Sequence, residues 1–172
     1  MSDPVPFENY VPPTWDVWFM KHVYLVAEKS KDPRTKIGAV IVKDKHIISS
    51  GFNGFPIGVK DLPERYADRQ TKYSMVAHAE DNAVLSAARF GISTLGTTLY
   101  TQGVPCCECA KSVIQGGIKE VVVHLQWPTM IQKWIESCKI AEMMLVESGV
   151  NVRWLQEPLG VKGYLDGKIF DV

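Results

Sequence analysis

The stretch 97-TTLYTQGVPCCECAKSVIQGGIKEVVVHL-125 places a helix-compatible segment between two runs rich in β-branched and aromatic residues. TTLYTQ and IKEVVVHL have the composition of strands, and CCECAKSVIQGG after Pro105 suits a short helix. Strands that alternate with helices in this way indicate an α/β fold. The closely spaced Cys106, Cys107 and Cys109 stand at the expected start of that helix.

The same alternation continues on both sides of this stretch. Helical or β-type spacing of apolar residues, with Thr14 as a candidate N-cap, defines the other elements. They are a helix over 14–30, a hairpin of strands over 37–43 and 46–52, a helix over 77–91, a helix over 128–149 and a strand over 150–155. This order predicts a three-layer α/β/α fold with a central mixed sheet of about five strands.

No internal repeat or linker divides the chain, so we expect a single domain over 1–172. The polar, proline-rich residues 1–13 are expected to form an N-terminal arm. Residues 156–172 contain glycines without a strong period and are expected to form a C-terminal tail. The connection over 53–76 is long for a compact domain, and connections of that length are usually functional.

Composition and charge restrict the class of protein. Hydrophobic residues make up 46% and charged residues 22% of the 172 residues, as in globular domains. Lys and Arg number 19, as do Asp and Glu, whereas proteins that follow a nucleic-acid backbone usually carry a basic excess. We therefore expect no nucleic-acid polymer as a partner.

The compartment follows from similar evidence. The sequence shows neither a signal-peptide pattern nor a run approaching the roughly 18 apolar residues of a membrane span. We expect a cytoplasmic protein without a membrane partner, in which four cysteines suggest thiolates or metal binding rather than disulfides.

Two short motifs stand at the starts of consecutive expected helices, HAE at His78 to Glu80 and PCCEC ending at Cys109. His78, Cys106 and Cys109 supply one imidazole and two thiolates, and three protein ligands leave a fourth tetrahedral position for water, as in catalytic zinc sites. Zinc lowers the pKa of bound water to roughly 7, which provides a nucleophile at neutral pH. Glu80 would move protons between that water and the leaving group.

Helix geometry supports this combination. Cys106 and Cys109 are three residues apart and share one helix face, and the helix N-terminus favours thiolates. Cys107 is rotated by about 100° from Cys106 and should point away from the metal. His78 and Glu80 would lie about 200° apart in mid-helix. In a first turn both can reach the site, because side chains lean toward the N-terminus.

Other interpretations of the cysteines remain open at this point. An isolated Cys-x-x-Cys can be a redox pair. A structural zinc site would need a fourth ligand, for which Cys138 and His124 are the candidates. We expect Cys138 to be a core residue and the isolated His22 and His46 to be surface or helix-face residues rather than ligands.

H-x-E combined with P-C-x-x-C is the signature of zinc nucleobase deaminases. The order of strands and helices also resembles the cytidine-deaminase-like fold. Within that superfamily the chain resembles the deoxycytidylate (dCMP) deaminases from residue 14 to about residue 125. The stretches that carry the resemblance are SKDPRTKIGAVIV (30–42), GFNGFPIG (51–58), TKYSMVAHAEDNAV (71–84) and PCCECAKSVIQGGIKEVVV (105–123).

The resemblance implies hydrolytic deamination of dCMP to dUMP and ammonia with one catalytic Zn²⁺ per subunit. Glu80 would protonate N3 of the cytosine and then the departing amine, a role that contributes about 10²–10⁴-fold. The expected metal ligands are His78, Cys106 and Cys109. The expected substrate-binding residues are Asn53, Arg34, Ala79 and Pro105.

The two substrate assignments outside the motifs have alternatives. Asn53 matches a position that holds the sugar in related deaminases, although Asn53-Gly54 is also typical of a plain turn. The 5′-phosphate needs cations, and Lys31, Arg34 and Lys36 cluster before the first strand. Arg34 is the expected phosphate contact, and a solvated basic loop is the alternative.

Members of the dCMP deaminase family, which the chain resembles, are often homohexamers that dCTP activates and dTTP inhibits. The matching segment is GFNGFPIG with the insert after it. The residues assigned to an allosteric nucleotide site are Gly54, Phe55, Pro56, Asp61, Glu64, Tyr66 and Arg89. Arg89 can equally be an exposed cation at a helix end. Residues 54–77 contain no Cys or His, so no second zinc site is expected there.

Two alternative functions share part of this pattern. Another deaminase of the superfamily, acting on cytidine or on an adenosine in tRNA, would carry the same metal motif, but the neutral net charge argues against tRNA. A non-catalytic module that senses dCTP or dTTP would keep the scaffold without turnover. The complete ligand set together with Glu80 argues against it.

Overall fold

The computed structural model describes residues 10–125 and 135–172. The helices are α1 (Trp15–Ala27), α2 (Pro63–Ala67), α3 (Arg69–Met75), α4 (Ala79–Arg89), α5 (Cys107–Gln115) and α6 (Ile135–Glu147). The strands are β1 (Gly38–Lys43), β2 (His46–Phe52), β3 (Thr98–Thr101), β4 (Glu120–His124), β5 (Asn151–Leu155), β6 (Lys162–Leu165) and β7 (Lys168–Asp171). Most of the expected arm and the expected start of the last helix at 128 lie outside the described residues.

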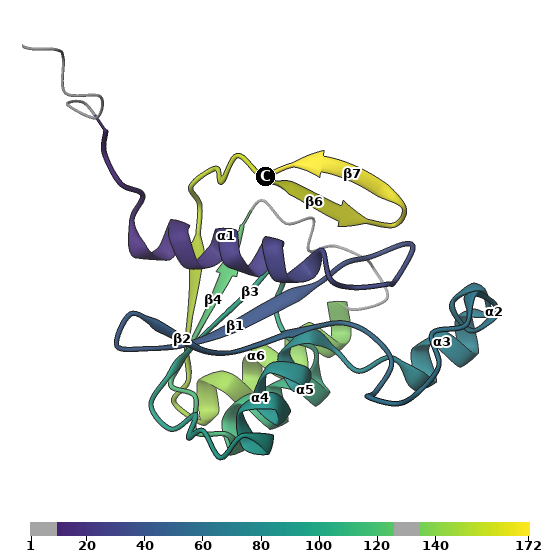
Figure 1. The fold of residues 1–172 in the computed structure, drawn as a ribbon. Coiled ribbons are helices and arrows are strands. Elements are labelled where there is room, and N and C mark those ends of the chain that lie inside the picture. Colours follow the sequence, from purple (N-terminus) through teal and green to yellow (C-terminus); the bar gives the residue numbers. More distant parts are fainter. Residues whose placement is uncertain (1–9, 126–134) are drawn as a thin grey trace, which may run out of the picture.

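The predicted mixed sheet of five strands is confirmed, in the order β2-β1-β3-β4-β5. Strand β1 is antiparallel to β2 and β3, whereas β3, β4 and β5 run parallel to one another. Parallel neighbours need a crossover connection, which α5 and α6 provide. Helices α4, α5 and α6 cover one face of the sheet, and α1 and the β6–β7 hairpin lie on the other (Figure 1).

The core has two halves because strand residues alternate between the faces of the sheet. Ile41 of β1 is buried among residues of α4, α5 and α6, and its neighbours Val40 and Val42 are buried among residues of α1. Burial on both faces explains why β1 is a continuous apolar run rather than an alternating one.

Two glycines allow helices to approach the sheet closely from opposite faces. A Cβ on Gly38 would lie 2.1 Å from the carbonyl oxygen of Val23 in α1, and one on Gly51 would lie 2.3 Å from that of Ala79 in α4. Any larger residue at Gly51 would push α4 away from β2. The first turn of α4, which contains Glu80, is thereby held directly against the sheet.

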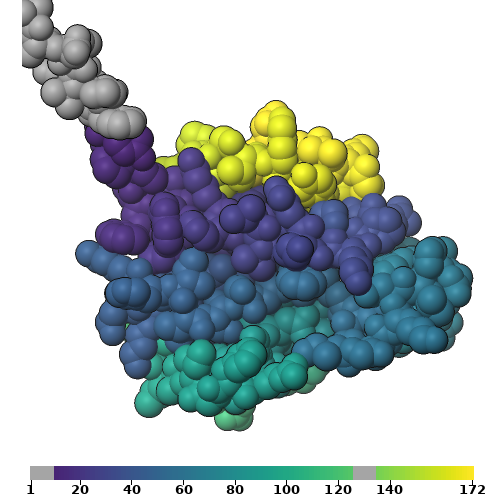
Figure 2. Space-filling view, in the orientation of Figure 1, coloured from purple at the N-terminus to yellow at the C-terminus, as the bar shows by residue number. Residues whose placement is uncertain are grey.

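The long connection after β2 forms an insert that contains the short helices α2 and α3. The insert begins at Gly54 and ends at Ala77, and these two residues form two backbone hydrogen bonds with each other, of 3.1 and 2.9 Å. Figure 2 shows the insert, in blue to teal, at one end of the molecule. Its return point immediately precedes His78.

The expected tail contains two short strands that the sequence analysis did not anticipate. Strands β6 and β7 pair antiparallel around a turn in which Asp166 and Gly167 have positive φ angles of 50° and 77°. Leu159 and Val172 are buried against the α1 half of the core. None of the helices in the described ranges has the length and apolar character needed to cross a membrane.

Candidate metal centre and active site

Two helices place the side chains of the HAE and PCCEC motifs at one edge of the sheet. His78 is the N-cap residue of α4, and Cys106 is the N-cap residue of α5, with Cys109 in the first turn. The two helices pack against each other. Their N-terminal ends meet, so that one potential ligand atom from each of His78, Cys106 and Cys109 lies within 4.8 Å of the others.

The mutual distances fit a tetrahedral zinc ion. Nδ1 of His78 lies 3.3 Å from Sγ of Cys106 and 3.3 Å from Sγ of Cys109, and the two sulfurs are 3.6 Å apart. Zinc bonds of the usual length at tetrahedral angles would separate two sulfurs by about 3.8 Å and nitrogen from sulfur by about 3.6 Å. The donor set of one imidazole and two thiols is one that zinc prefers.

The three groups also shift one another's proton affinities. The pKa of Cys106 falls to about 4, chiefly because of its hydrogen bond with the Cys109 thiol and then that with His78. The pKa of His78 rises to about 9 because of its hydrogen bond with Cys106. The pKa of the Cys109 thiol is raised by the hydrogen bond with Cys106 and by burial. Metal binding must displace the remaining protons and is therefore pH-dependent.

Glu80 lies beside this cluster on the first turn of α4 and is 6% exposed. Its Oε2 lies 3.6 Å from Sγ of Cys109, and its Oε1 accepts a hydrogen bond of 3.0 Å from the Thr101 hydroxyl. Burial raises the pKa of this carboxyl above its usual range. A raised pKa brings a carboxylate closer to the value suited to proton transfer near neutral pH.

The other cysteines and histidines lie outside the metal cluster. Cys107 is half-buried, and its backbone N–H donates to Oγ of Ser137. Cys138 is half-buried and not the core residue that was expected, and its thiol donates to the carbonyl oxygen of Val104 in the loop before α5. His124 is buried and hydrogen-bonded to the Tyr24 hydroxyl at 2.8 Å. Within residues 10–125 and 135–172, no fourth Cys or His joins the three candidate ligands.

The expected substrate residues lie at the same edge of the sheet. Asn53 follows β2, is 6% exposed, and accepts a hydrogen bond of 2.8 Å on Oδ1 from the N–H of Ile37. Arg34 has an exposed side chain on the loop between α1 and β1. Ala79 and Pro105 are buried and stand next to the candidate metal ligands His78 and Cys106 in the sequence.

Part of the set assigned to an allosteric site gathers inside the insert. The rings of Phe55 and Tyr66 stack with centroids 4.3 Å apart and an interplanar angle of 13°. The Tyr66 hydroxyl donates to Oδ1 of Asp61 at 2.9 Å. Burial and then this hydrogen bond raise the pKa of Tyr66 to about 12.

The remaining members of that set are placed differently. Gly54 belongs to the backbone bridge with Ala77, and Pro56 and Glu64 are exposed on the insert. Arg89 is exposed in the last turn of α4, at the opposite end of the helix from His78. The structure therefore does not bring Arg89 together with the insert of the same chain.

Three polar residues near the site, Thr101, Asp32 and Lys72, were not expected from the sequence. Thr101 ends β3, and its role was not visible because Glu80 is distant in the sequence. Asp32 and Lys72 form a buried ion pair. Both lie in stretches that carry the family resemblance, SKDP and TKY, which was the available signal.

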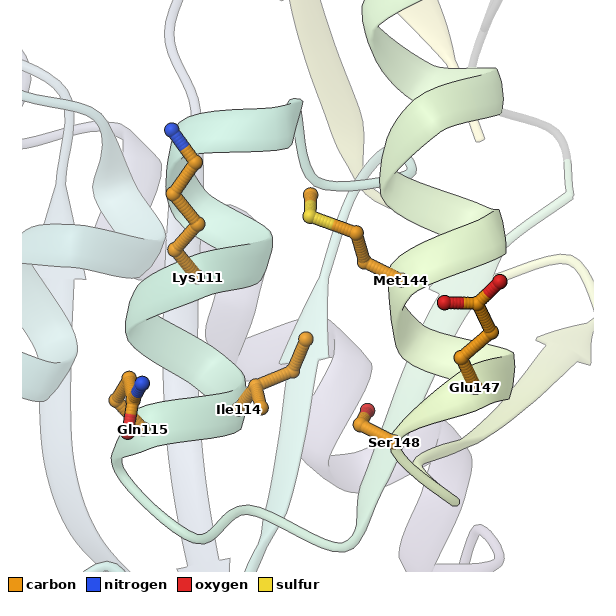
Figure 3. Close-up of a pocket in the computed structure, with 6 residues that line it drawn as sticks. All are labelled: Lys111, Ile114, Gln115, Met144, Glu147 and Ser148. Atoms are coloured by element: carbon orange, nitrogen blue, oxygen red, sulfur yellow. The ribbon is translucent and has the colours of Figure 1, made fainter.

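A shallow groove between α5 and α6 is not part of this site. Figure 3 shows its lining side chains on the later turns of the two helices. They are Lys111, Ile114, Gln115, Met144, Glu147 and Ser148. Because Cys106 stands at the start of α5, the metal cluster lies at the other end of that helix.

The chain is similar to proteins of one family. The model of the cytidine and deoxycytidylate deaminase zinc-binding region matches residues 13–125. An uncharacterized deaminase of Aliivibrio fischeri is 38% identical over 141 residues, which cover 82% of this chain and 93% of that one. Human deoxycytidylate deaminase is 42% identical over 114 residues, 63% of each chain.

A solved structure agrees with the sequence comparisons. The dCMP deaminase of the cyanophage S-TIM5, in complex with dCMP and dUMP, superposes with a TM-score of 0.64 at 26% identity. The superposition covers 85% of this chain and 100% of that one. Since the family match spans more than half of the sequence and contains the whole metal cluster, the chain belongs to the cytidine and deoxycytidylate deaminase family.

Proposed function

We propose that the protein is a zinc-dependent enzyme that converts dCMP and water to dUMP and ammonia. The observation that carries this proposal is the placement of the buried Glu80 carboxylate, 3.6 Å from Cys109, beside the cluster formed with His78 and Cys106. The named dCMP deaminases among the relatives support the choice of substrate.

The reaction requires a nucleophile and two proton transfers. Zinc held by His78, Cys106 and Cys109 would supply an activated water at neutral pH. Glu80 would accept a proton from the water and deliver it to N3 of the cytosine. It would then take the remaining proton from the oxygen bonded to C4 and pass it to the amine at C4, so that the C4–N bond breaks, ammonia leaves and the C4=O group of dUMP forms. No oxidant or reductant is needed.

Hydrogen bonding prepares Glu80 for this role. Thr101 donates to Oε1 of Glu80 at 3.0 Å, and Oε2 faces the metal cluster. Because the carboxylate is held in one orientation, little rearrangement is needed at the moment of proton transfer. Burial keeps bulk water away from the carboxylate and raises its pKa.

The nucleotide would be held by Asn53 at the sugar and by Arg34 at the 5′-phosphate, with Ala79 and Pro105 beside the base. This assignment is supported by the position of Asn53 next to Gly54, whose partner Ala77 precedes His78. The exposed Arg34 side chain is available to an anion.

Regulation by dCTP and dTTP in a homohexamer is part of the same proposal. The stacked Phe55 and Tyr66, with Asp61 beside them, form an ordered centre in the insert. Exposed apolar side chains on and after α4, such as Leu85 at 63% and Phe90 at 73%, offer surface for subunit contacts. The free cysteines fit a reducing compartment such as the cytoplasm.

A substrate panel tests the proposal. Purified enzyme with measured zinc content is assayed for ammonia release from dCMP, CMP, cytidine and an adenosine-containing tRNA anticodon stem-loop. We expect the highest kcat/KM with dCMP. Equal or higher values with cytidine or the tRNA would assign the chain to another branch of the superfamily, and activity with none of the substrates would favour a binding module.

A further inference from the structure

A buried ion pair connects the insert to the loop before β1. Nζ of Lys72 in α3 lies 2.6 Å from Oδ2 of Asp32, and the two side chains are 10% and 2% exposed. Removing one partner of such a pair leaves an uncompensated charge in the interior, which is strongly unfavourable. The position of Asp32 is therefore tied to the position of α3.

The Asp32 carboxylate in turn organises the loop that contains Arg34. Its Oδ1 accepts hydrogen bonds from the backbone N–H groups of Arg34 at 2.9 Å and Thr35 at 3.2 Å. These contacts form an Asx-type turn. The direction in which the Arg34 side chain leaves the loop is consequently set by Asp32.

The same carboxylate also contacts Asn53. The Nδ2 group of Asn53 donates to Oδ2 of Asp32 at 3.4 Å and to the carbonyl oxygen of Thr35 at 2.9 Å. The Ser30 hydroxyl donates to the carbonyl oxygen of Asn53 at 2.8 Å. Asp32 thus contacts both residues assigned to the substrate outside the motifs, the backbone of Arg34 and the side chain of Asn53.

The second ion pair between the insert and this loop is much weaker. Lys31 and Asp61 lie 2.7 Å apart, but the Lys31 side chain is 69% exposed. Exposed pairs of this kind contribute little, because water and salt screen them. Lys72 is therefore the main polar link from the insert to the substrate loop among the described residues.

We propose that Lys72 and Asp32 are positioning residues for the nucleotide, through which α3 of the insert sets the geometry of Arg34 and Asn53. This inference rests on the proposed function. Neither residue is a metal ligand, so loss of the pair should weaken nucleotide binding while the metal cluster and Glu80 stay intact.

Three variants test the role of Lys72. Lys72→Met removes the charge and keeps an unbranched stem, Lys72→Arg keeps the charge, and Lys139→Met removes a lysine from an exposed pair with Glu136 on α6. We expect Lys72→Met to raise KM for dCMP about 10-fold, with kcat changed less than about 3-fold. Lys72→Arg should stay within about 3-fold of the wild type, and Lys139→Met should match it.

A double variant guards against misfolding. Lys72→Met leaves Asp32 buried and unpaired, whereas Asp32→Asn with Lys72→Met removes both charges and relieves that cost. We expect the double variant to fold, to bind one zinc per chain and still to show the raised KM. A wild-type KM in folded, zinc-loaded double variant would overturn the proposal, as would a fall in kcat and zinc content at constant KM.

Hydrogen exchange separates this inference from the proposed function. Lys72→Met should speed amide exchange in residues 30–37 but not in β4, whatever the substrate. If wild-type enzyme does not turn over dCMP, the proposed function fails while faster exchange in 30–37 still supports the link. Equal exchange in the wild type and the variant would overturn the link itself.

Discussion

The hydroxyl of Thr101 donates a hydrogen bond of 3.0 Å to Oε1 of Glu80, which joins the carboxyl end of β3 to the first turn of α4. The contact orients a carboxylate whose other oxygen faces Cys109. It also lowers the pKa of Glu80, against the larger effect of burial, which raises it. Thr101 therefore adjusts both the direction and the proton affinity of the proposed general base.

Thr101→Val tests this adjustment, because valine keeps the shape and removes the hydroxyl. We expect kcat to fall about 10-fold and the acidic limb of the pH–rate profile to move to higher pH, since the pKa of Glu80 rises further when the hydrogen bond is lost. Steady-state rates from pH 5 to 9 measure both effects. An unchanged acidic limb in zinc-loaded enzyme would contradict the role given to Thr101.

Replacement of Glu80 by glutamine should separate metal binding from turnover. Glutamine fills the same space but cannot accept and return a proton, so we expect kcat to fall by at least about 10²-fold. Zinc content should stay near one per chain, because Glu80 is not among the three ligands. Wild-type activity in this variant would remove Glu80 from the mechanism.

The cysteines should differ in their effect on metal content. Cys106→Ser and Cys109→Ser each remove a proposed zinc ligand, and we expect folded protein with far less than one zinc per chain. Cys107→Ser is the matched control, because Cys107 stands between the two proposed ligands in the sequence but outside the cluster. Elemental analysis of purified protein decides the matter, and zinc loss in Cys107→Ser would show that the ligand set is misassigned.

We expect the folded protein to lose stability in mild acid because His124 is buried. Burial lowers its pKa below the ordinary value of 6.5, so the unfolded chain takes up the proton before the folded protein does. Stability is thus intact above pH 6.5 and declines as the pH falls from there toward the lower folded-state pKa. Melting temperatures from pH 7.5 to 5.5 measure the decline.

Two histidine variants show whether His124 causes that decline. His124→Gln keeps hydrogen-bonding capacity beside Tyr24 but does not titrate, and should flatten the dependence of melting temperature on pH. His46→Gln, at an exposed position, should leave it unchanged. A slope that is the same in all three proteins would assign the decline to other groups.

The proposed regulation predicts a change in the shape of the rate curve. We expect activity against dCMP concentration to become more hyperbolic with dCTP and to be suppressed by dTTP. Phe55→Ala removes the ring stacked on Tyr66 and should weaken both responses without loss of zinc. Indifference of the wild-type enzyme to both nucleotides would remove the regulatory proposal and leave the catalytic one in place.

The sequence predicted those parts of the fold that depend on local pattern. The apolar run of β1 and the helical spacing in α1 indicated their elements, and Thr14 caps α1 through its hydroxyl. The grouping of His78, Cys106 and Cys109 could be predicted from the sequence for a related reason. The three candidate ligands stand at the N-terminal ends of two helices, and the spacing of Cys106 and Cys109 alone indicates that these two share a helix face.

The parts that were missed depend on contacts between distant segments. Strands β6 and β7 have four residues each and show no regular alternation of buried and exposed residues, so no periodicity reveals them. The burial of Lys72 follows only once Asp32 lies beside it, 40 positions earlier in the chain. A lysine in a polar segment is otherwise expected to face water.

The closure of the insert at Gly54 and Ala77 has an evolutionary consequence. Because the excursion begins and ends at one backbone bridge, residues can be added or removed between these points without changing the distance from β2 to His78. Natural variation can therefore reshape the insert as a separate module while the catalytic scaffold stays as it is. Such variation must retain Lys72, since its replacement would leave the buried Asp32 carboxylate without a positive partner.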